Sequence, residues 1–351
     1  MKTINLQQLI RPHILDLKPY SSARDEFTGA AEVYLDANEN SFGSLIGQNF
    51  HRYPDPYQKE LKSAIAELKN VPADKIFLGN GSDEAIDLLI RLFCRPGKDK
   101  ILIMPPTYGM YEVSAKINDV AVVEIPLTEK FQIQISQVEE QMQANLKIIF
   151  ICSPNNPSGN DFMADHVKTI LDDFDGIVVV DEAYIDYTQR ESYNRWLSAY
   201  PNLVVMQTFS KAWGIAALRL GMAFASEEII HYLNKIKPPY NVNLQTQQLG
   251  LQVLQKEEIK EKQVTELLKQ REILMTKLTN LSTVEYVYPS NANFLLVRVK
   301  DANQMYKYLM DMKVIVRNRS NIKLCGNCLR ITVGTPAENK ILLQAFHTFE
   351  L

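Results

Sequence analysis

The 351-residue chain has no long apolar run, and its formal net charge is only −3. A transmembrane helix needs roughly 18 or more consecutive apolar residues, so the sequence predicts no membrane span. The first five residues also lack the apolar stretch of a secretory signal peptide. A net charge this small provides no overall field that would attract nucleic acid or an anionic membrane. We therefore expect a cytoplasmic protein that binds neither nucleic acid nor membrane.

Cysteine and histidine are scarce, with four and five residues. Only Cys325 and Cys328 have a spacing that occurs in zinc and redox sites. A zinc site would need two further ligands, and neither a second cysteine pair nor a nearby histidine is present. A redox pair would be expected at the start of a helix, whereas the Gly-Asn between these cysteines favours a hairpin turn joining strands at 322–324 and 329–333. We therefore predict structural cysteines and no metal site.

Hydrophobic residues make up 46% of the chain and charged residues 23%, which is typical of a globular protein with a large core. Its length favours two domains. Helical periodicity over 58–68 and 83–93 alternates with short apolar runs, as in a parallel sheet covered by helices on both faces. The predicted strands of this α/β unit are 76–78, 101–104, 121–125, 148–152, 177–180, 203–206 and 222–225.

The pattern changes near residue 244, where a long helical stretch begins that is rich in charge over 256–269. Strands are predicted at 294–297 and 314–316, and a last helix from about residue 337. This arrangement favours a smaller α+β domain. We expect an N-terminal arm with part of the small domain at 1–43, a large α/β domain at 44–245, and the small C-terminal domain at 246–351. Within the arm, residues 1–30 are expected to form an extended segment or short helix that packs on another part of the protein.

Lys211 follows one of these buried strands, 203–206. An ammonium group is costly to desolvate, and burial lowers the pKa of a lysine until its amine is a usable nucleophile. Asp181 follows the strand at 177–180, and Arg219 precedes the strand at 222–225. A lone lysine in this position would more often be a solvated strand end. An acid, a lysine and an arginine together at adjacent strand ends suggest an anionic, imine-forming cofactor, for which pyridoxal phosphate is the obvious candidate.

Two loops add weaker signals for a bound phosphate. The turn at 78–83 contains two glycines and opens a helix, whose free amides can hold a phosphate. Many strand-to-helix turns share this pattern, so it does not establish a phosphate site. The loop at 152–159 is rich in proline and asparagine at the carboxyl end of a strand, where open α/β sheets bind ligands. These residues also form ordinary turns.

A family resemblance rests on four motifs. Asn156-Pro157-x-Gly159, Asp181-x-x-Tyr184, Ser210-Lys211 and Arg219, in this order and spacing, resemble the pyridoxal-phosphate-dependent aminotransferases of fold type I. The segments 34–40, 52–56, 105–111, 238–243 and 329–335 resemble the histidinol-phosphate aminotransferases among them. The similarity extends from about Arg11 to the C-terminus. It implies a large, mostly parallel mixed sheet with helices on both faces, a smaller α+β domain, and pyridoxal 5′-phosphate as cofactor.

The resemblance also implies roles for residues around the cofactor ring. Lys211 would bind the cofactor covalently and later act as the general base. Asp181 would pair with the pyridine nitrogen. Tyr184 and Asn156 would donate hydrogen bonds to the phenolic oxygen, and Tyr108 would stack on the ring. Lys211, Asp181 and Tyr184 are therefore the expected catalytic residues.

Other positions match residues that hold phosphate groups in this family. Arg219 would bind the cofactor phosphate through charge-assisted hydrogen bonds. The remaining expected phosphate ligands are Ser210 and the amides of Gly81, Ser82 and Asp83. Tyr53 would reach the cofactor phosphate of a neighbouring subunit, which implies a homodimer with shared active sites.

The expected substrate residues lie near both ends of the chain. Arg330 matches the residue that binds the substrate α-carboxylate through its planar guanidinium. Arg317 matches the position that contacts the substrate phosphate, and Tyr20 and Asn38 match positions that line the substrate end. Arg319 could assist Arg317, but at a loop edge it is expected to be solvated.

The resemblance predicts amino transfer between L-histidinol phosphate and 2-oxoglutarate, giving imidazole acetol phosphate and L-glutamate in histidine biosynthesis. An aromatic or broad-specificity aminotransferase and a phospho-amino-acid decarboxylase of the same fold are alternatives with the same cofactor. A non-catalytic sensor is a third alternative. It would need an added DNA-binding module, and only about thirty residues precede the predicted core.

Overall fold

Seven strands form the central mixed sheet, in the order β1-β7-β6-β5-β4-β2-β3. The computed structural model describes residues 2–21, 31–47 and 49–349. Strand β7 runs antiparallel to both of its neighbours, and the other neighbouring pairs are parallel. All seven strands predicted from apolar runs are confirmed. They are β1 (Ile76–Asn80), β2 (Lys100–Ile103), β3 (Ala121–Glu124), β4 (Leu146–Cys152), β5 (Ile177–Asp181), β6 (Leu203–Thr208) and β7 (Leu220–Phe224).

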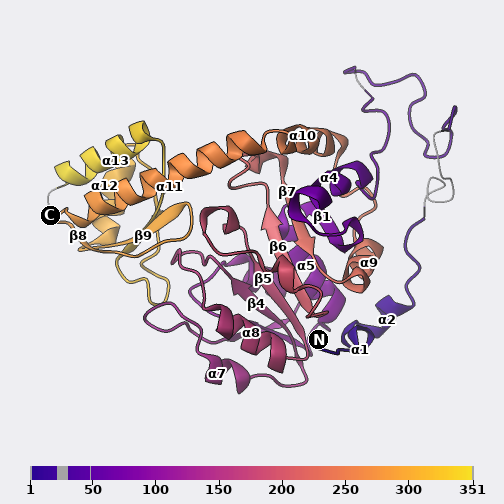
Figure 1. Ribbon diagram of the computed structural model, residues 1–351, viewed down its shortest axis with the longest axis horizontal. Helices are drawn as coiled ribbons and strands as arrows, with labels where there is room; N and C mark the ends of the chain where they lie inside the picture. Colours follow the sequence, from indigo (N-terminus) through magenta and orange to yellow (C-terminus); the bar gives the residue numbers. More distant parts are fainter. Residues whose placement is uncertain (1, 22–30, 48, 350–351) are drawn as a thin grey trace.

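Both faces of the sheet are buried along β4 to β7, which explains why these strands consist almost entirely of apolar residues, whereas the edge strand β3 is partly exposed. Side chains of a strand alternate between faces, so Ile177 and Val179 pack into one core while Val178 and Val180 pack into the other. Helices α5 and α9 contribute to the first core, and α4 and α8 to the second (Figure 1). The helices are α4 (Lys59–Lys69), α5 (Ser82–Phe93), α6 (Met110–Ile117), α7 (Ile135–Glu139), α8 (Ala164–Asp173), α9 (Glu227–Ile236) and α10 (Leu244–Leu254). The single-turn 3₁₀ helices are η1 (Ala73–Lys75), η2 (Ile185–Tyr187), η3 (Tyr193–Trp196) and η4 (Ala216–Leu218).

Two short helices, α1 (Leu6–Leu9) and α2 (Pro12–Leu15), begin the chain. Leu6, Ile10 and Ile14 are buried in the same core as α5 and α9. The expectation of a short helical segment that packs on another part of the protein is therefore confirmed for the described part of 1–30. Residues 22–30 lie outside the described residues.

A second, antiparallel sheet of four strands has the order β10-β11-β9-β8. Its strands are β8 (Val284–Val287), β9 (Phe294–Val299), β10 (Arg317–Asn318) and β11 (Cys328–Thr332), and its helices are α11 (Glu257–Thr279), α12 (Ala302–Asp311) and α13 (Pro336–Thr348). Residues of both the helices and the sheet form a separate core. The long helix α11 extends from α10 beside the large sheet to this smaller unit (Figure 1).

Two local predictions near the C-terminus were wrong. Residues 314–316 do not form a strand, because Val314 N–H donates to Leu309 O and closes the end of α12. Pairing begins only at Arg317, and the apolar pattern at 314–316 reflects packing of two valines against the small core. Residues 322–324 do not form a hairpin arm either. They lie in consecutive turns, and β11 pairs with β10 instead.

The turn between Cys325 and Cys328 is present, since Cys328 N–H donates to Cys325 O at 3.0 Å. The cysteines at 94, 152, 325 and 328 are buried and form no disulfide. The described part of the chain contains no cluster of three metal-ligating side chains. Nor does any helix in that part combine the length and the apolarity required to cross a bilayer.

Candidate active site

A cavity of about 580 Å³ lies between the two sheets, at the carboxyl ends of β4, β5 and β6. Twelve residues singled out from the sequence line it. They are Ser82, Asp83, Tyr108, Asn156, Asp181, Tyr184, Ser210, Lys211, Arg219, Arg317, Arg319 and Arg330. The fold therefore brings predicted site residues from both halves of the chain together in one cavity. Gly81 is not in the wall itself but adjoins Arg219 directly behind it.

Lys211 lies just beyond β6, half-buried in the cavity wall. Its Nζ is 5.6 Å from the centre of the Tyr184 ring, and it forms no ion pair with a described residue. Burial lowers the pKa of this lysine, and the positive charges of Arg330 and Arg219 lower it further. The cavity therefore favours a neutral, nucleophilic amine at this position.

Asp181, the last residue of β5, is buried with 3% exposure. Its Oδ2 accepts a 2.6 Å hydrogen bond from Tyr111 Oη, and its Oδ1 accepts one from Ala183 N–H. Burial raises the pKa of Asp181 to about 6, although both hydrogen bonds oppose the shift. No cation of the described chain pairs with this carboxylate. A buried carboxylate that faces a cavity in this way is suited to a cationic ligand group.

Asn156 and Tyr184 lie next to each other beside the lysine. Asn156 Nδ2 is 3.4 Å from Tyr184 Oη, and Asn156 Oδ1 accepts a 2.6 Å hydrogen bond from Arg330 Nη1. Burial raises the pKa of Tyr184 well above its usual range, which keeps the hydroxyl protonated. Tyr108 also lines the cavity, and its hydroxyl donates to Asp83 Oδ1 at 3.0 Å.

A tight cradle forms where β1 turns into α5. Gly81 has φ +77°, and its N–H donates to Arg219 O at 2.7 Å. A Cβ on Gly81 would approach Arg219 Nη2 to 2.7 Å, and one on Gly221 would lie 2.1 Å from the backbone nitrogen of Ser82. Arg219 itself has φ +54°, and its Nη2 pairs with Asp83 Oδ2 at 3.3 Å. The backbone can make this approach only with glycine, and the result is a fixed arginine beside the amino end of a helix, which suits a phosphate.

Besides Gly81, three predicted site residues lie outside the lining of this cavity. Tyr53 and Asn38 line a different pocket of about 350 Å³, and the Tyr53 ring stacks on Tyr240 with 4.5 Å between centroids. Tyr20 is 70% exposed near Tyr57.

Two residues of the site were missed or misjudged in the sequence. Tyr111 had no assigned role, although it lies only three residues after Tyr108 and their rings meet edge to face, with 5.5 Å between centroids. Arg319 was expected to be solvated, but it is half-buried and lines the cavity. Its spacing of two from Arg317 in an extended segment is the signal that could have indicated this.

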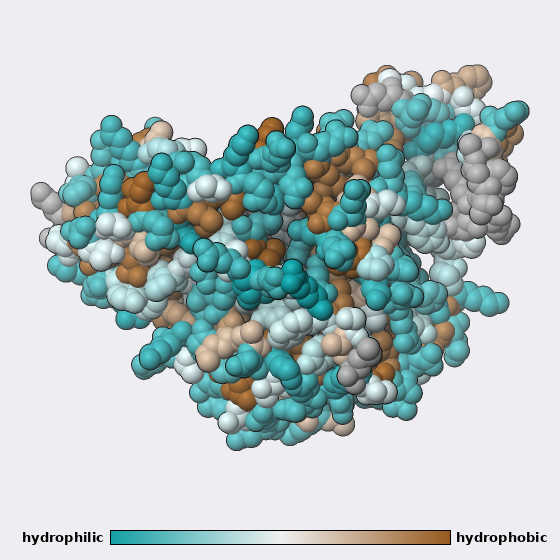
Figure 2. All heavy atoms as spheres, in the orientation of Figure 1, coloured by the Kyte–Doolittle hydropathy of each residue, from teal (hydrophilic) through white to brown (hydrophobic). Residues whose placement is uncertain are grey.

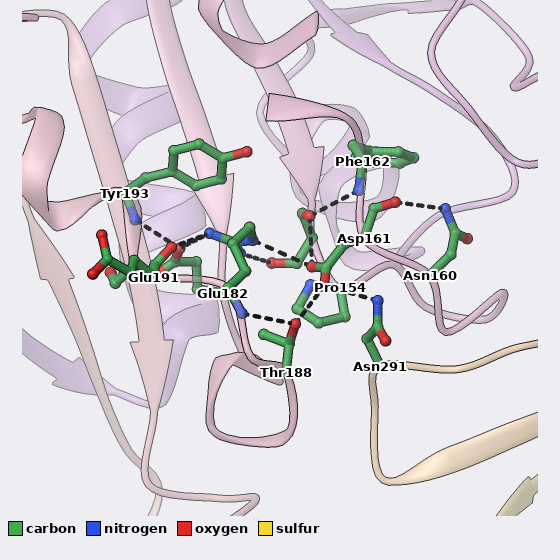
Figure 3. A network of polar contacts seen from close by, with 12 residues as sticks. Pro154, Asn160, Asp161, Phe162, Glu182, Thr188, Glu191, Tyr193 and Asn291 are labelled. Carbon is green, nitrogen blue, oxygen red and sulfur yellow. Dashed lines mark hydrogen bonds and ion pairs between the residues drawn. The ribbon is translucent and has the colours of Figure 1, made fainter. Parts of the chain in front are cut away.

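A buried polar network supports the cavity from behind (Figure 3). Glu182 is fully buried and accepts hydrogen bonds from Arg190 Nη1, Ser192 Oγ, Tyr193 N–H and Gln207 Nε2 at 2.6–3.0 Å. Because Glu182 directly follows Asp181, these bonds fix the end of β5 beside the site.

The same network holds the loop that carries Asn156. Arg190 donates to Ser153 O at 3.0 Å and pairs with Asp161 at 3.3 Å. It therefore contacts the loop both before and after Asn156. Asn291, just before β9 of the smaller unit, donates its side chain to Asp161 and its backbone N–H to Gly159 O at 2.6 Å (Figure 3). This loop is therefore connected to both units.

The sequence matches the family described as aminotransferase class I and II over residues 22–346. The chain belongs to this family. It is 55% identical over 345 residues to the histidinol-phosphate aminotransferase of Cytophaga hutchinsonii, covering 98% of this chain and 99% of that protein. It is 51% identical over 351 residues to the protein of the same name from Bacteroides fragilis, with both chains fully covered.

A solved structure has the same fold. The histidinol-phosphate aminotransferase of Sinorhizobium meliloti, determined in complex with pyridoxal-5′-phosphate, has a TM-score of 0.78, 20% identity and 89% coverage of each chain. The mixed α/β architecture predicted from the sequence is thus that of the fold type I aminotransferases, and this member is a pyridoxal-phosphate-dependent transaminase.

The aminotransferase cavity fits this cofactor on three observations. Lys211 is a half-buried amine with a lowered pKa and no ion-pair partner among the described residues. Asp181 is a buried carboxylate that forms no ion pair with a described residue, which suits a protonated pyridine nitrogen. The Gly81 turn and Arg219 leave a cradle of phosphate-binding character at the far side of the cavity.

Proposed function

We propose that this aminotransferase exchanges amino and keto groups between L-histidinol phosphate and 2-oxoglutarate, giving imidazole acetol phosphate and L-glutamate, in histidine biosynthesis. The observation that carries the proposal is a pair of arginines. Arg317 of β10 lies directly opposite Arg330 of β11, and both line the cavity that contains Lys211. Like charges opposite each other on a sheet are unfavourable, so a bound anionic group would stabilise this pair. The relatives of that name, at 51% and 55% identity over nearly the whole chain, support the substrate.

In this proposal the chain's own groups hold the cofactor and move the proton. Bound pyridoxal phosphate supplies a reactive carbonyl carbon and a ring that withdraws electrons. Lys211 would hold the cofactor through its amine and would move the proton at the substrate α-carbon. Asp181 would pair with the ring nitrogen, and the hydrogen bond from Tyr111 fixes the orientation of its carboxylate.

Residues around these two groups complete the site. Tyr184 and Asn156 would donate hydrogen bonds to the phenolic oxygen, and Tyr108 would cover the ring. Arg330 binds the anionic group next to the reacting carbon. The phosphate of the cofactor is assigned to Arg219, Ser210 and the amides of Gly81, Ser82 and Asp83. Tyr20 and Asn38 remain proposed substrate residues.

We also propose that the protein is a homodimer and that it is located in the cytoplasm. The proposed domain limits are 1–43, 44–245 and 246–351. The segment between 31 and 57 exposes large apolar side chains, including Leu35 at 81%, Phe42 at 101% and Leu45 at 100%. Figure 2 shows brown surface on this arm at the upper right. An apolar surface of this kind supports subunit contact. Tyr53 from that arm would then contact the partner's cofactor phosphate.

The substrate is tested by spectroscopy of the holoenzyme without a keto acid. L-Histidinol phosphate should bleach the yellow absorption of the enzyme-bound cofactor in a single turnover, and 2-oxoglutarate should restore it. Phenylalanine should act much more slowly. Efficient bleaching by phenylalanine and none by histidinol phosphate would replace this substrate with an aromatic amino acid. Release of carbon dioxide from O-phosphothreonine would instead favour the decarboxylase.

Shared sites are tested by mixing two inactive variants. In a heterodimer of Lys211→Ala and Tyr53→Ala subunits, one site retains both native residues. The mixture should therefore regain activity beyond the sum of the two separate variants, in proportion to subunit exchange. A mixture that stays at that sum, with exchange shown by mass spectrometry, would count against a role for Tyr53 across the interface.

A further inference from the structure

Arg319 has an environment that the other residues of the chain do not explain. It follows Arg317 by two positions in an extended segment, so both side chains point to the same side. Asn318, between them, points away and donates to Asn303 at 2.8 Å. Arg317 and Arg319 thereby line one wall of the cavity together with Arg330.

Arg317, Arg319 and Arg330 form an arginine cluster that no carboxylate of the described residues pairs with. Within the described residues none of the three forms an ion pair, and the only side-chain hydrogen bond is from Arg330 to Asn156. The Arg319 Nε atom is buried without a hydrogen-bond partner. Burial lowers the pKa of Arg319, and the charges of Arg330 and Arg317 lower it further. Three cations that face one cavity in this way are poised for a ligand with more than one negative charge.

The charges of the two proposed substrates differ. Glutamate carries two carboxylates with one charge each, for which Arg330 and one further arginine are sufficient. A phosphate monoester concentrates nearly two charges and three acceptor oxygens at one end of the molecule. A third guanidinium is useful only for the second kind of group, because a single carboxylate has no remaining charge to offer it.

We propose that Arg319 is a specificity-determining residue that binds the phosphate group of the substrate together with Arg317. The assignment rests on the proposed function, since it names the substrate group that the third arginine recognises. It predicts that Arg319 contributes to the binding of phosphorylated substrates and little to that of dicarboxylates.

The test compares Arg319→Gln and Arg319→Lys with Arg195→Gln, a control on an exposed surface pair. Two half-reactions of the holoenzyme are followed by absorbance, one with L-histidinol phosphate and one with L-glutamate. For Arg319→Gln we expect kcat/KM to fall about 10- to 100-fold with histidinol phosphate, mainly through KM, and less than about threefold with glutamate. Arg319→Lys should lie between, because it keeps the charge and loses the planar fork.

Inorganic phosphate provides a readout that does not depend on the substrate. As an inhibitor of the glutamate half-reaction, it should bind the Arg319→Gln holoenzyme about tenfold more weakly than the wild type. The unfolding midpoint should not fall, because the variant removes one charge from a repelling cluster. Equal losses with both substrates, or unchanged phosphate inhibition, would overturn the inference. If the wild type does not use histidinol phosphate, the proposed function fails, while phosphate inhibition still decides whether Arg319 binds phosphate.

Discussion

Asn156 Oδ1 accepts a 2.6 Å hydrogen bond from Arg330 Nη1, which joins the loop after β4 to strand β11 of the smaller sheet. This hydrogen bond occupies one nitrogen of the Arg330 guanidinium, so the remaining N–H donors are available to a ligand in the cavity. It also fixes the Asn156 side chain so that its amide faces Tyr184. A residue assigned to the cofactor and one assigned to the substrate therefore orient each other before either ligand binds.

Lys211→Ala should reduce transamination by at least about 10²–10⁴-fold, the usual contribution of a general base, because the variant also loses covalent attachment of the cofactor. Single-turnover absorbance measures the loss, and added methylamine should restore part of the rate. Lys262→Ala, at an exposed position of α11, is the control. A Lys211→Ala enzyme with near-normal turnover would remove the central assignment.

Asp181 should make the cofactor-free protein less stable as the pH rises from about 4 to about 6. Burial raises the folded-state pKa to about 6, whereas an unfolded aspartate titrates near 4. In that window the folded state binds more protons than the unfolded state, so the free energy of unfolding decreases with increasing pH. The shift corresponds to about 3 kcal/mol at neutral pH.

This dependence is measured by urea unfolding of the wild type and Asp181→Asn at several pH values. The stability of the wild type relative to the variant should fall across the window by that amount and then become constant. Asp74→Asn, at an exposed position, should leave the profile of the wild type unchanged. A relative stability that rises with pH would show that the carboxylate is stabilised as the anion.

Tyr111→Phe should reduce activity about tenfold or more and shift the acid limb of the pH–rate profile to higher pH. The variant keeps the stacking on Phe150, at 4.6 Å between centroids, and removes only the hydrogen bond that lowers the pKa of Asp181. A hydrogen bond to a charged group is worth about 1.5–3 kcal/mol. Tyr286→Phe, which changes an exposed hydroxyl, serves as the matched control. Reduced activity without a shifted acid limb would mean that Tyr111 does not act through Asp181.

Arg190→Met should destabilise the protein by about 3–5 kcal/mol, because it leaves the buried Glu182 carboxylate without its cation. Urea denaturation measures the loss. The double variant Arg190→Met/Glu182→Gln should be more stable than the sum of the single effects predicts, since the two groups interact directly. Simple additivity would mean that the ion pair contributes nothing specific.

Strands and site residues could be predicted from the sequence where neighbouring residues along the chain form a recognisable pattern. The strands from β1 to β7 were predictable because most of their residues are apolar, as expected for a sheet that helices cover on both faces. Lys211, Asp181 and Arg219 were predictable because each is a charged residue at the end of such a run. The strand at 314–316 failed because packing against the small core produces the same apolar pattern as strand pairing.

Contacts between distant segments had no local signal. Nothing near Arg190 in the sequence indicates that it joins Ser153 and Asp161 to Glu182. The hydrogen bond between Asn156 and Arg330 depends on the relative placement of the two sheets. The hydrophobic periodicity of the sequence does not indicate that placement. Arg319 was misjudged because an exposed loop edge in the sequence became a cavity wall in three dimensions.

The antiparallel placement of β7 has a consequence for synthesis on the ribosome. Strand β1 pairs only with β7 within the described sheet, from Ile76 with Phe224 to Asn80 with Leu220. A growing chain must therefore keep β1 unpaired while β2 to β6 emerge, and a product that ends before Leu220 would expose two sheet edges. Such edges are prone to intermolecular pairing. Premature termination in the region from β2 to β6 should consequently yield aggregates, and the cradle around Arg219 can form only after β7 has joined the sheet.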